Sequence, residues 1–269
     1  MHAKKDNKKL RESFEQAANI YQQARPDYPE PLFDDVIHVT NLQPGDRLLE
    51  VGCATGKATL PLANRGFTMT CIELGAELAK IARQNLVGMD VTVINESFEG
   101  WQPEAESRFD LVFAATAWRW VDPQVKYNKA WQILRPGGHL AFWNADHVFP
   151  DDGDPFFREI QTVYYEIGEG ELVDNNDWPR PGELLEQRDE IERSGLFEMV
   201  HVRHFDWERM YRADEYITLL ETFSGHILME EWKRHKLFNE IKVRLESRPE
   251  KSVRRHWGAV LHVARRKDR

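Results

Sequence analysis

The sequence predicts an α/β protein built on a doubly wound, mostly parallel β-sheet. Apolar, β-branched runs recur at spacings of about 20 to 30 residues, with helical patterns between several of them. The runs are almost continuously hydrophobic, which is typical of strands covered on both faces. Strands that alternate with helices in this way form a parallel sheet. The runs span residues 47–52, 67–74, 91–98, 109–117 and 139–144.

Helices are predicted before and between these strands. Residues 11–37 are expected to form two helices separated at residues 24–31, where three prolines within six residues cannot lie in a helix interior. Residues 75–86 and 122–138 each place apolar side chains on one stripe. The second pattern ends in Arg135–Gly138, which predicts a helix stop followed by a tight turn.

The chain beyond the fifth run is predicted to be irregular at first. An irregular stretch over residues 144–181 is followed by a helix through Leu184 and Ile191 and a strand over 197–207. Helices between residues 213 and 245 then precede a last strand over 254–266. These two strands would complete a seven-stranded sheet.

Composition excludes several classes of protein. The 269 residues carry a net charge of -9, which argues against a general nucleic-acid binder, and the basic ends (residues 4–11 and 264–269) are expected to be solvated tails. No apolar run approaches the ~20 residues that span a bilayer, and the N-terminus lacks a signal-peptide core. The two cysteines have no metal-ligand spacing. We therefore expect a cytoplasmic protein without a bound metal.

The glycine-rich stretch after the first strand is the strongest candidate for a ligand site. A phosphate loop needs four residues between its glycines and a hydroxyl residue after the lysine, whereas Gly52 and Gly56 are three residues apart and Lys57 precedes Ala58. A dinucleotide loop needs a third glycine where Lys57 stands, so that interpretation is weak although it remains open.

The remaining pattern is acid-x-G-x-G-x-G, with Glu50 as the acid, Gly52 and Gly56 as the outer glycines and Ala54 at the middle position. Ala54 suffices there if its φ is negative. Lys57 is predicted to be a solvent-facing residue at a helix start, which places Pro61 in or just after the first turn.

With these motifs in order, the sequence resembles the class I S-adenosylmethionine-dependent methyltransferases. The resemblance is greatest to the small-molecule branch of ubiquinone/menaquinone-type and trans-aconitate-type enzymes, and it runs from about Phe14 to Asn144. It implies a sheet order of 3-2-1-4-5-7-6 with the last strand antiparallel. It also implies S-adenosylmethionine as cofactor and S-adenosylhomocysteine as product.

The resemblance assigns cofactor-binding roles along the sheet edge. Small residues of the loop, including Cys53, would let the backbone turn beneath the ligand, while Glu50 would add negative charge near its ammonium group. Glu73 would accept both ribose hydroxyls. Leu74 would press on the adenine, which Glu96, Ser97 and Phe98 would flank.

The end of the fourth strand would hold the methionine part of the cofactor. Ala115 and Thr116 are small enough to leave room there, and the ring of Trp118 would project toward the transferable methyl group. Trp120 is expected in the core. In the N-terminal helix and the break after it, the resemblance directs Tyr21 and Arg25 toward the cofactor and Tyr28 toward the substrate.

Methyl transfer needs a base only if the acceptor must lose a proton. His147, directly after the fifth strand, is the candidate catalytic residue and a candidate substrate contact, together with His226 and Trp178. Their alternative role is structural, because an isolated histidine more often packs or is exposed.

Residues 146–177 contain ten acidic residues and one basic residue. A solvated loop is one interpretation of this acidic segment. The other is an acidic lid that favours a neutral or cationic acceptor over an anionic one. The acids are Asp146, Asp151, Asp152, Asp154, Glu159, Glu166, Glu169, Glu171, Asp174 and Asp177.

We interpret residues 1–269 as a single domain. Residues 1–45 would form an N-terminal helical cover and 46–144 the cofactor-binding core, with substrate-cover insertions at 145–182 and 212–247. The predicted function is methyl transfer to a small molecule. The alternatives are an NAD(P)-dependent reductase on a related sheet and a non-catalytic protein that binds S-adenosylmethionine or S-adenosylhomocysteine.

Overall fold

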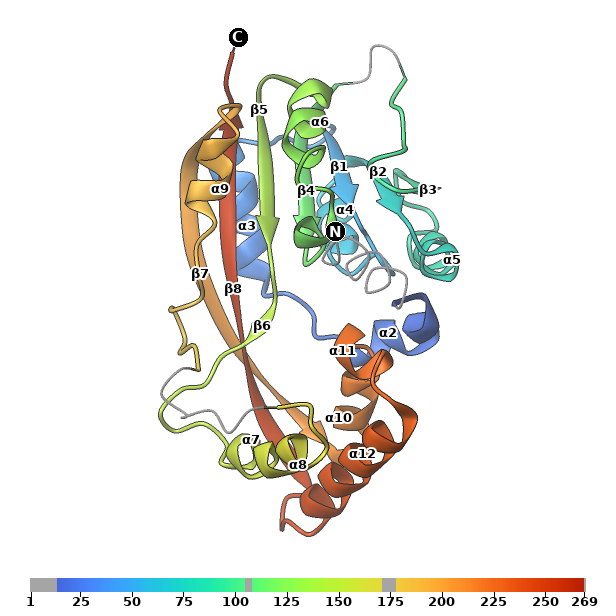
Figure 1. The fold of residues 1–269 in the computed structure, drawn as a ribbon. Helices are drawn as coiled ribbons and strands as arrows, with labels where there is room; N and C mark the ends of the chain where they lie inside the picture. Colours follow the sequence, from blue (N-terminus) through green and yellow to red (C-terminus); the bar gives the residue numbers. More distant parts are fainter. Residues whose placement is uncertain (1–13, 105–107, 171–177, 269) are drawn as a thin grey trace. The chain divides into compact units, whose positions relative to one another are not determined.

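A computed structural model describes residues 14–104, 108–170 and 178–268 (Figure 1). Two compact units divide the chain. The helical unit comprises Met1–Pro26, Asp146–Leu184 and Asp206–Gly258, and the sheet unit comprises Asp27–Ala145, Leu185–Phe205 and Ala259–Arg269. The predicted insertions 145–182 and 212–247 fall almost entirely within the helical unit. That they cover a substrate stays a prediction.

Parallel strands form most of the sheet. β1 pairs with β2 and β4, β2 pairs with β3, and β4 pairs with β5, all in parallel. The apolar runs of β1, β2 and β4 are mostly buried, as expected of strands covered on both faces. The edge strand β3 has no fully buried residue, which corrects the prediction for that run. The strands are β1 (Arg47–Val51), β2 (Thr68–Glu73), β3 (Val91–Asn95), β4 (Phe109–Ala115) and β5 (Leu134–Trp143).

Two long strands complete the sheet. β8 (Ser252–Arg266) is antiparallel to β5, and β7 (Phe197–Arg212) pairs with β8. The order β3-β2-β1-β4-β5-β8-β7 confirms the predicted arrangement of seven strands. An eighth, unpredicted strand, β6 (Asp146–His147), also pairs with β8. The basic C-terminus is not a tail through Arg266, because β8 extends to that residue. Residues 4–11 lie outside the described residues.

The predicted turn at Arg135–Gly138 is instead an irregularity within β5. Phe109 pairs with Leu134 and Leu111 with His139, so this segment bulges out of the ladder between β4 and β5. Gly137 has φ +74°, which a bulge accommodates readily in a glycine. The helix before it therefore ends at Ile133.

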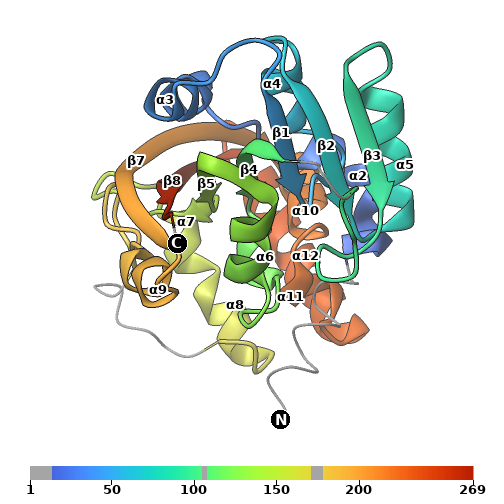
Figure 2. The ribbon, with the colours of Figure 1, turned by 90° about the horizontal axis from the view of Figure 1, so that it is seen from above.

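Helices cover both faces of this sheet. Figures 1 and 2 show α6 on one face and α3 and α4 on the other. The predicted helix through Leu184 and Ile191 is shorter than expected and excludes Leu184. The helices of the sheet unit are α3 (Glu30–Thr40), α4 (Thr59–Ala63), α5 (Ala76–Asn85), the 3-10 helix η2 (Trp118–Trp120), α6 (Lys126–Ile133) and α9 (Arg188–Arg193).

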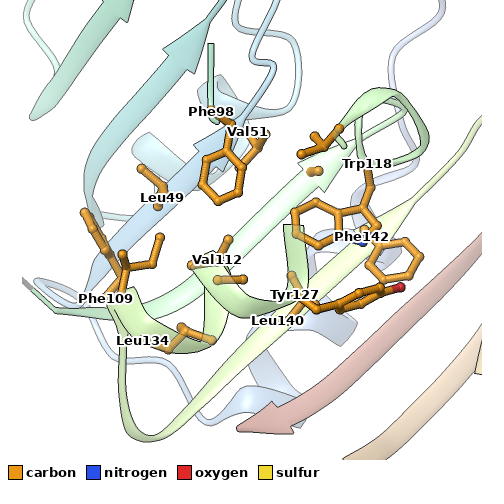
Figure 3. Close-up of a cluster of buried hydrophobic side chains, with 14 of the residues drawn as sticks. Leu49, Val51, Phe98, Phe109, Val112, Trp118, Tyr127, Leu134, Leu140 and Phe142 are labelled. Carbon is orange, nitrogen blue, oxygen red and sulfur yellow. The ribbon is translucent and has the colours of Figure 1, made fainter. Parts of the chain in front are cut away.

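Trp118 lies in a buried hydrophobic cluster of the sheet unit (Figure 3). Its ring is 1% exposed and stacks on Phe142 at a centroid distance of 5.8 Å, with Tyr127 packed edge-on at 5.7 Å. Trp120 is only partly buried. This corrects the sequence-based interpretation, which placed Trp120 in the core and the Trp118 ring beside the reacting methyl group. Trp118 packs inward because Phe142 stacks on its ring and Tyr127 packs edge-on against it.

The helical unit is built mainly from short helices. Among them, α10 packs against α12 and α2. Parts of the predicted irregular stretch are helical, since α7 and α8 lie within it. None of the described helices is both long and apolar enough to cross a bilayer. The helices are η1 (Phe14–Ala17), α2 (Ala18–Ala24), α7 (Phe156–Glu159), α8 (Gln161–Glu166), α10 (Ala213–Leu220), α11 (Ser224–Ile227) and α12 (Glu231–Glu246).

Candidate functional site

The glycine-rich loop follows the carboxyl end of β1 and takes a left-handed backbone at alternate residues. Gly52 has φ +72°, Ala54 +49° and Gly56 +90°. The expected negative φ at Ala54 is therefore wrong. An alanine there is strained by about 1–2 kcal/mol relative to the right-handed region. The chain adopts at Ala54 the conformation that a middle glycine would take.

Glu73 explains why Ala54 is held in this conformation. The Ala54 N–H donates to Glu73 Oε2 at 2.8 Å, and the Gly75 N–H donates to Glu73 Oε1 at 2.8 Å. A carboxylate at the tip of β2 thus connects the loop to the start of α5. Asn95, which the sequence did not single out, donates its amide to the carbonyls of Glu73 and Leu74 at 2.9 Å each.

Close packing requires glycine at both outer positions of the loop. A Cβ on Gly52 would lie 2.5 Å from the Cβ of Ala117, and one on Gly56 would lie 3.2 Å from Leu86 Cδ1. Leu86 is the C-cap of α5, and the side chain of Asn85, the last residue of that helix, donates to Thr55 O at 2.9 Å. The loop is therefore in close contact with Ala117, just after β4, and with Leu86, just after α5.

Glu50 is fully buried beside the loop. Its Oε2 accepts a hydrogen bond from Thr59 at 2.5 Å, while Oε1 has no hydrogen-bond partner among the described residues. Burial, opposed by the Thr59 hydroxyl and reinforced by the charge of Glu73, raises the pKa of Glu50 to about 8. At neutral pH the carboxyl is mostly protonated. The predicted negative charge would be restored by a cation placed beside it.

The residues after Gly56 correct a second prediction. α4 begins at Thr59, so Pro61 lies in its first turn as expected. Lys57 is not solvent-facing, because its side chain is 10% exposed and its Nζ lies 2.6 Å from Asp27 Oδ1. Cys53 is a buried thiol whose pKa is raised by a hydrogen bond with Cys71 and by burial.

The predicted adenine contacts are divided between surface and core. Leu74 is 37% exposed at the end of β2, and Glu96 is exposed after β3, with its N–H bonded to Glu73 O at 3.0 Å. Ser97 Oγ accepts from the Gly100 N–H at 3.0 Å. The Phe98 ring lies in the core against Trp118, so this ring is a packing residue. Adenine contacts by the other three stay a prediction.

Tyr28 and Thr116, predicted as substrate and cofactor contacts, lie together at the end of β4. Their hydroxyl oxygens are 2.8 Å apart, and the Ala145 N–H donates to Thr116 Oγ1 at 3.3 Å. Thr116 has φ +61°, which is a genuine outlier for a β-branched residue. Ala115, the preceding residue, is partly buried. Backbone outliers of this kind cluster at active sites and ligand-binding sites.

Tyr21 and Arg25 belong to the helical unit. The Arg25 guanidinium donates to Thr222 Oγ1 at 2.8 Å and to Thr222 O at 2.7 Å, and it lies over the rings of Phe223 and Tyr21 at 4.3 and 5.3 Å. These contacts hold Arg25 within its own unit. A contact of either residue with the cofactor stays a prediction.

His147 and Trp178 join one aromatic cluster in the helical unit. Phe149 connects them, because its ring lies 3.8 Å from His147 and 4.1 Å from Trp178, while Phe157 packs on His147 at 4.3 Å. Burial, followed by the charges of Arg255 and His256, lowers the pKa of His147 far below its ordinary value. Such an imidazole is a weak base, which argues against general-base catalysis by His147.

His226 is also buried in the helical unit. Its Nε2 lies 2.8 Å from the hydroxyl of Tyr164, which belongs to the acidic segment 146–177. Burial and then the charge of Arg255 lower the pKa of His226 to about 4. His226 is therefore neutral at pH 7, and its contact with substrate stays a prediction.

Basic side chains neutralise much of the acidic segment. Asp151 pairs with Arg180, Asp154 with Arg248, and Glu166 with Lys236. Asp152 and Glu169 also have basic partners. Glu171, Asp174 and Asp177 lie outside the described residues. This pairing removes much of the negative field on which the hypothesis of a neutral or cationic acceptor depends.

The loop suits a cationic cofactor better than a phosphate. The Ala54 N–H is committed to Glu73, and the Glu73 carboxylate would repel an anion. A helix N-terminus does not follow the loop directly, since α4 begins only at Thr59. Among the described residues no cluster of three His, Cys, Asp or Glu could hold a metal ion.

Comparison with known proteins agrees with this geometry. Residues 49–142 match a family described as a methyltransferase domain. The chain is 26% identical over 238 residues to an uncharacterized methyltransferase of Mycobacterium bovis, a similarity that covers 88% of this chain and 87% of that protein.

Solved structures share the fold. One, assigned as a type II methyltransferase from Anaeromyxobacter dehalogenans, superposes with a TM-score of 0.60 at 21% identity and covers 90% of this chain and 97% of that one. Another is a methyltransferase from Geobacter sulfurreducens in complex with S-adenosylhomocysteine, with a TM-score of 0.50, 15% identity and coverage of 91% and 93%.

Proposed function

We propose that this chain, which belongs to the class I S-adenosylmethionine-dependent methyltransferases, methylates a small molecule at the carboxyl edge of its sheet unit. The observation that carries the proposal is the junction of the loop with Glu73, where one carboxylate holds a left-handed Ala54 and the start of α5. A ligand with hydroxyls and a positive charge fits this acidic junction.

The loop and its two acids would hold the cofactor. Glu73 offers carboxylate oxygens to the ribose hydroxyls, and Leu74 supplies an exposed apolar surface for the adenine. When bound, S-adenosylmethionine supplies a methyl group activated on a sulfonium cation. Glu50 would then change from a protonated to a charged carboxyl as a cation approaches.

The chain's own contribution to the reaction is mainly positioning. Thr116 is hydrogen-bonded to Tyr28 and to the Ala145 N–H, and these contacts would fix the end of β4 where the acceptor is aligned. Alignment of this kind can supply about 7–11 kcal/mol of a barrier. A small-molecule acceptor without nucleic acid, and a cytoplasmic location, stay predictions.

Calorimetric titration with S-adenosylhomocysteine and with NADH tests the cofactor. We expect S-adenosylhomocysteine to bind and NADH not to bind. Glu73→Gln should weaken S-adenosylhomocysteine binding about tenfold or more, because a charge-assisted contact is lost. Glu77→Gln is the matched control, since Glu77 is exposed on α5 and pairs with Lys80.

Three results would contradict the proposal. Binding of NADH without S-adenosylhomocysteine would favour a reductase. Equal affinities of the Glu73→Gln and Glu77→Gln variants would remove Glu73 from the cofactor site. Binding of S-adenosylhomocysteine without turnover of any of a panel of small acceptors would favour the non-catalytic alternative.

A further inference from the structure

Arg255 is buried in the helical unit at a position that the strand pattern reserves for apolar residues. Along β8, Val253 is 0% exposed, Arg255 8% and Trp257 1%, while Arg254 and His256 between them are partly exposed. Alternate residues of a strand point to opposite faces. The arginine therefore takes an inward position between two core side chains.

Aromatic rings surround its guanidinium. The charged carbon lies 4.4 Å from the ring centroid of Trp257 and 5.4 Å from that of Phe223, and Nη1 donates to the Tyr216 hydroxyl at 3.2 Å. Rings of this kind stabilise a cation through its faces. They provide no negative charge and no acceptors for the remaining N–H groups.

Among the described residues no carboxylate lies within ion-pair distance of Arg255. Its Nε is buried without a hydrogen-bond partner. Nearby arginines differ, because Arg254 pairs with Asp152 and Arg248 with Asp154. Asp152 and Asp154 thus neutralise Arg254 and Arg248, whereas no described acid of the helical unit neutralises the buried Arg255.

A guanidinium cannot lose its charge by deprotonation at physiological pH. Burying an unpaired charge is strongly unfavourable, and buried arginines are normally paired. We propose that Arg255 is the binding site for a carboxylate of a small organic ligand, which contacts the Nε edge of the guanidinium. The planar fork of arginine matches a carboxylate through two parallel hydrogen bonds.

The surroundings define the ligand further. Tyr216, Phe223 and Trp257 give the site aromatic walls, which suit a ligand with an apolar body next to its carboxylate. His147 and His226 are neutral because burial lowers their pKa values, so neither replaces the missing anion.

The arginine side chain itself provides the test. In a ¹H–¹⁵N spectrum of the full chain, the Arg255 Nε–H signal is identified by its loss in Arg255→Lys. Acetate should shift this signal in a saturable manner, and its neutral analogue acetamide should not. Arg254 on the same strand is the internal control. An identical response at both arginines, or to both probes, would overturn the proposal.

The stability of the free protein provides a second readout. Arg255→Met removes a buried charge that has no counter-ion, so its thermal midpoint should equal or exceed that of the wild type, and its midpoint should not respond to acetate. Arg254→Met should keep the acetate response. A large loss of stability in Arg255→Met, together with no acetate shift at Arg255 in the wild type, would make Arg255 a structural residue.

Binding of S-adenosylhomocysteine separates the two proposals. If it binds and acetate does not reach Arg255, the carboxylate inference fails and the methyltransferase function stands. If acetate binds and S-adenosylhomocysteine does not, the anion site stands and the proposed function fails.

Discussion

Glu50 in the sheet unit and Arg255 in the helical unit are both buried ionisable groups without an opposite charge beside them among the described residues, yet burial affects them differently. Glu50 takes up a proton, and burial raises its pKa to about 8. Arg255 cannot lose its proton and remains charged among aromatic rings. A buried carboxyl can stay neutral until a cation binds beside it. A buried arginine stays charged, so a bound anion would stabilise it.

The largest effect that would sharpen this comparison is the pH dependence due to Glu50. Its pKa is raised from 4.5 to about 8 by folding, so the folded state holds a proton that the unfolded state releases. Stability therefore falls as pH rises through this window, by at most about 5 kcal/mol. Glu50→Gln should flatten the slope.

Denaturant unfolding at about pH 5, 7 and 8.5 measures this slope. Glu77→Gln, at an exposed site, should keep the wild-type profile. Parallel profiles for wild type and Glu50→Gln would show that the buried carboxyl does not hold the proton.

The next largest effect is the loss of stability expected when the loop is distorted at Gly52 while Glu50 is left unchanged. Gly52→Ala places a Cβ 2.5 Å from that of Ala117 at a residue with φ +72°, and should destabilise the protein by about 2–4 kcal/mol. Gly45→Ala is the control for backbone strain alone, because Gly45 has φ +92° and open space around it. If both variants lose the same stability, the contact with Ala117 is unimportant.

The smallest effect concerns the strained residue of the loop. Ala54→Gly should stabilise the protein by about 0.5–1 kcal/mol, since relief of a left-handed alanine exceeds the added entropy of the unfolded chain. Ala58→Gly, at a residue with φ -90°, should instead destabilise it. Unfolding curves that show equal losses for both would contradict the strain at Ala54.

Much of the fold follows from the sequence because hydrophobic runs and their spacing specify a covered parallel sheet. The order of the strands and the loop's approach to Glu73 agree with the pattern of the motifs. Local conformation was harder to predict. Ala54 adopts a positive φ because a distant carboxylate holds its N–H, and Arg135–Gly138 bulges within β5 because the strand pairing continues past it.

At the candidate sites, the sequence does not show which side chains will contact one another, and this limits the prediction of their roles. The sequence marks Trp118 as a site residue, but whether a tryptophan faces ligand or core depends on Phe142 and Tyr127, which come from other elements. Several acids of the acidic segment pair with basic residues about 30 to 100 positions away in the sequence. Arg255 could have been found in the sequence, because it is a charged residue at the inward position between Val253 and Trp257 of the last strand.

Cross-titration of two variants with two ligands tests the central claim most directly. Glu73→Gln and Arg255→Met are each titrated with S-adenosylhomocysteine and with acetate, beside the wild type. The account predicts that Glu73→Gln weakens S-adenosylhomocysteine about tenfold or more and keeps the acetate response. Arg255→Met should lose the acetate response and keep the wild-type affinity for S-adenosylhomocysteine. The account would be contradicted if either variant lost both ligands. It would also be contradicted if both variants bound both ligands as the wild type does.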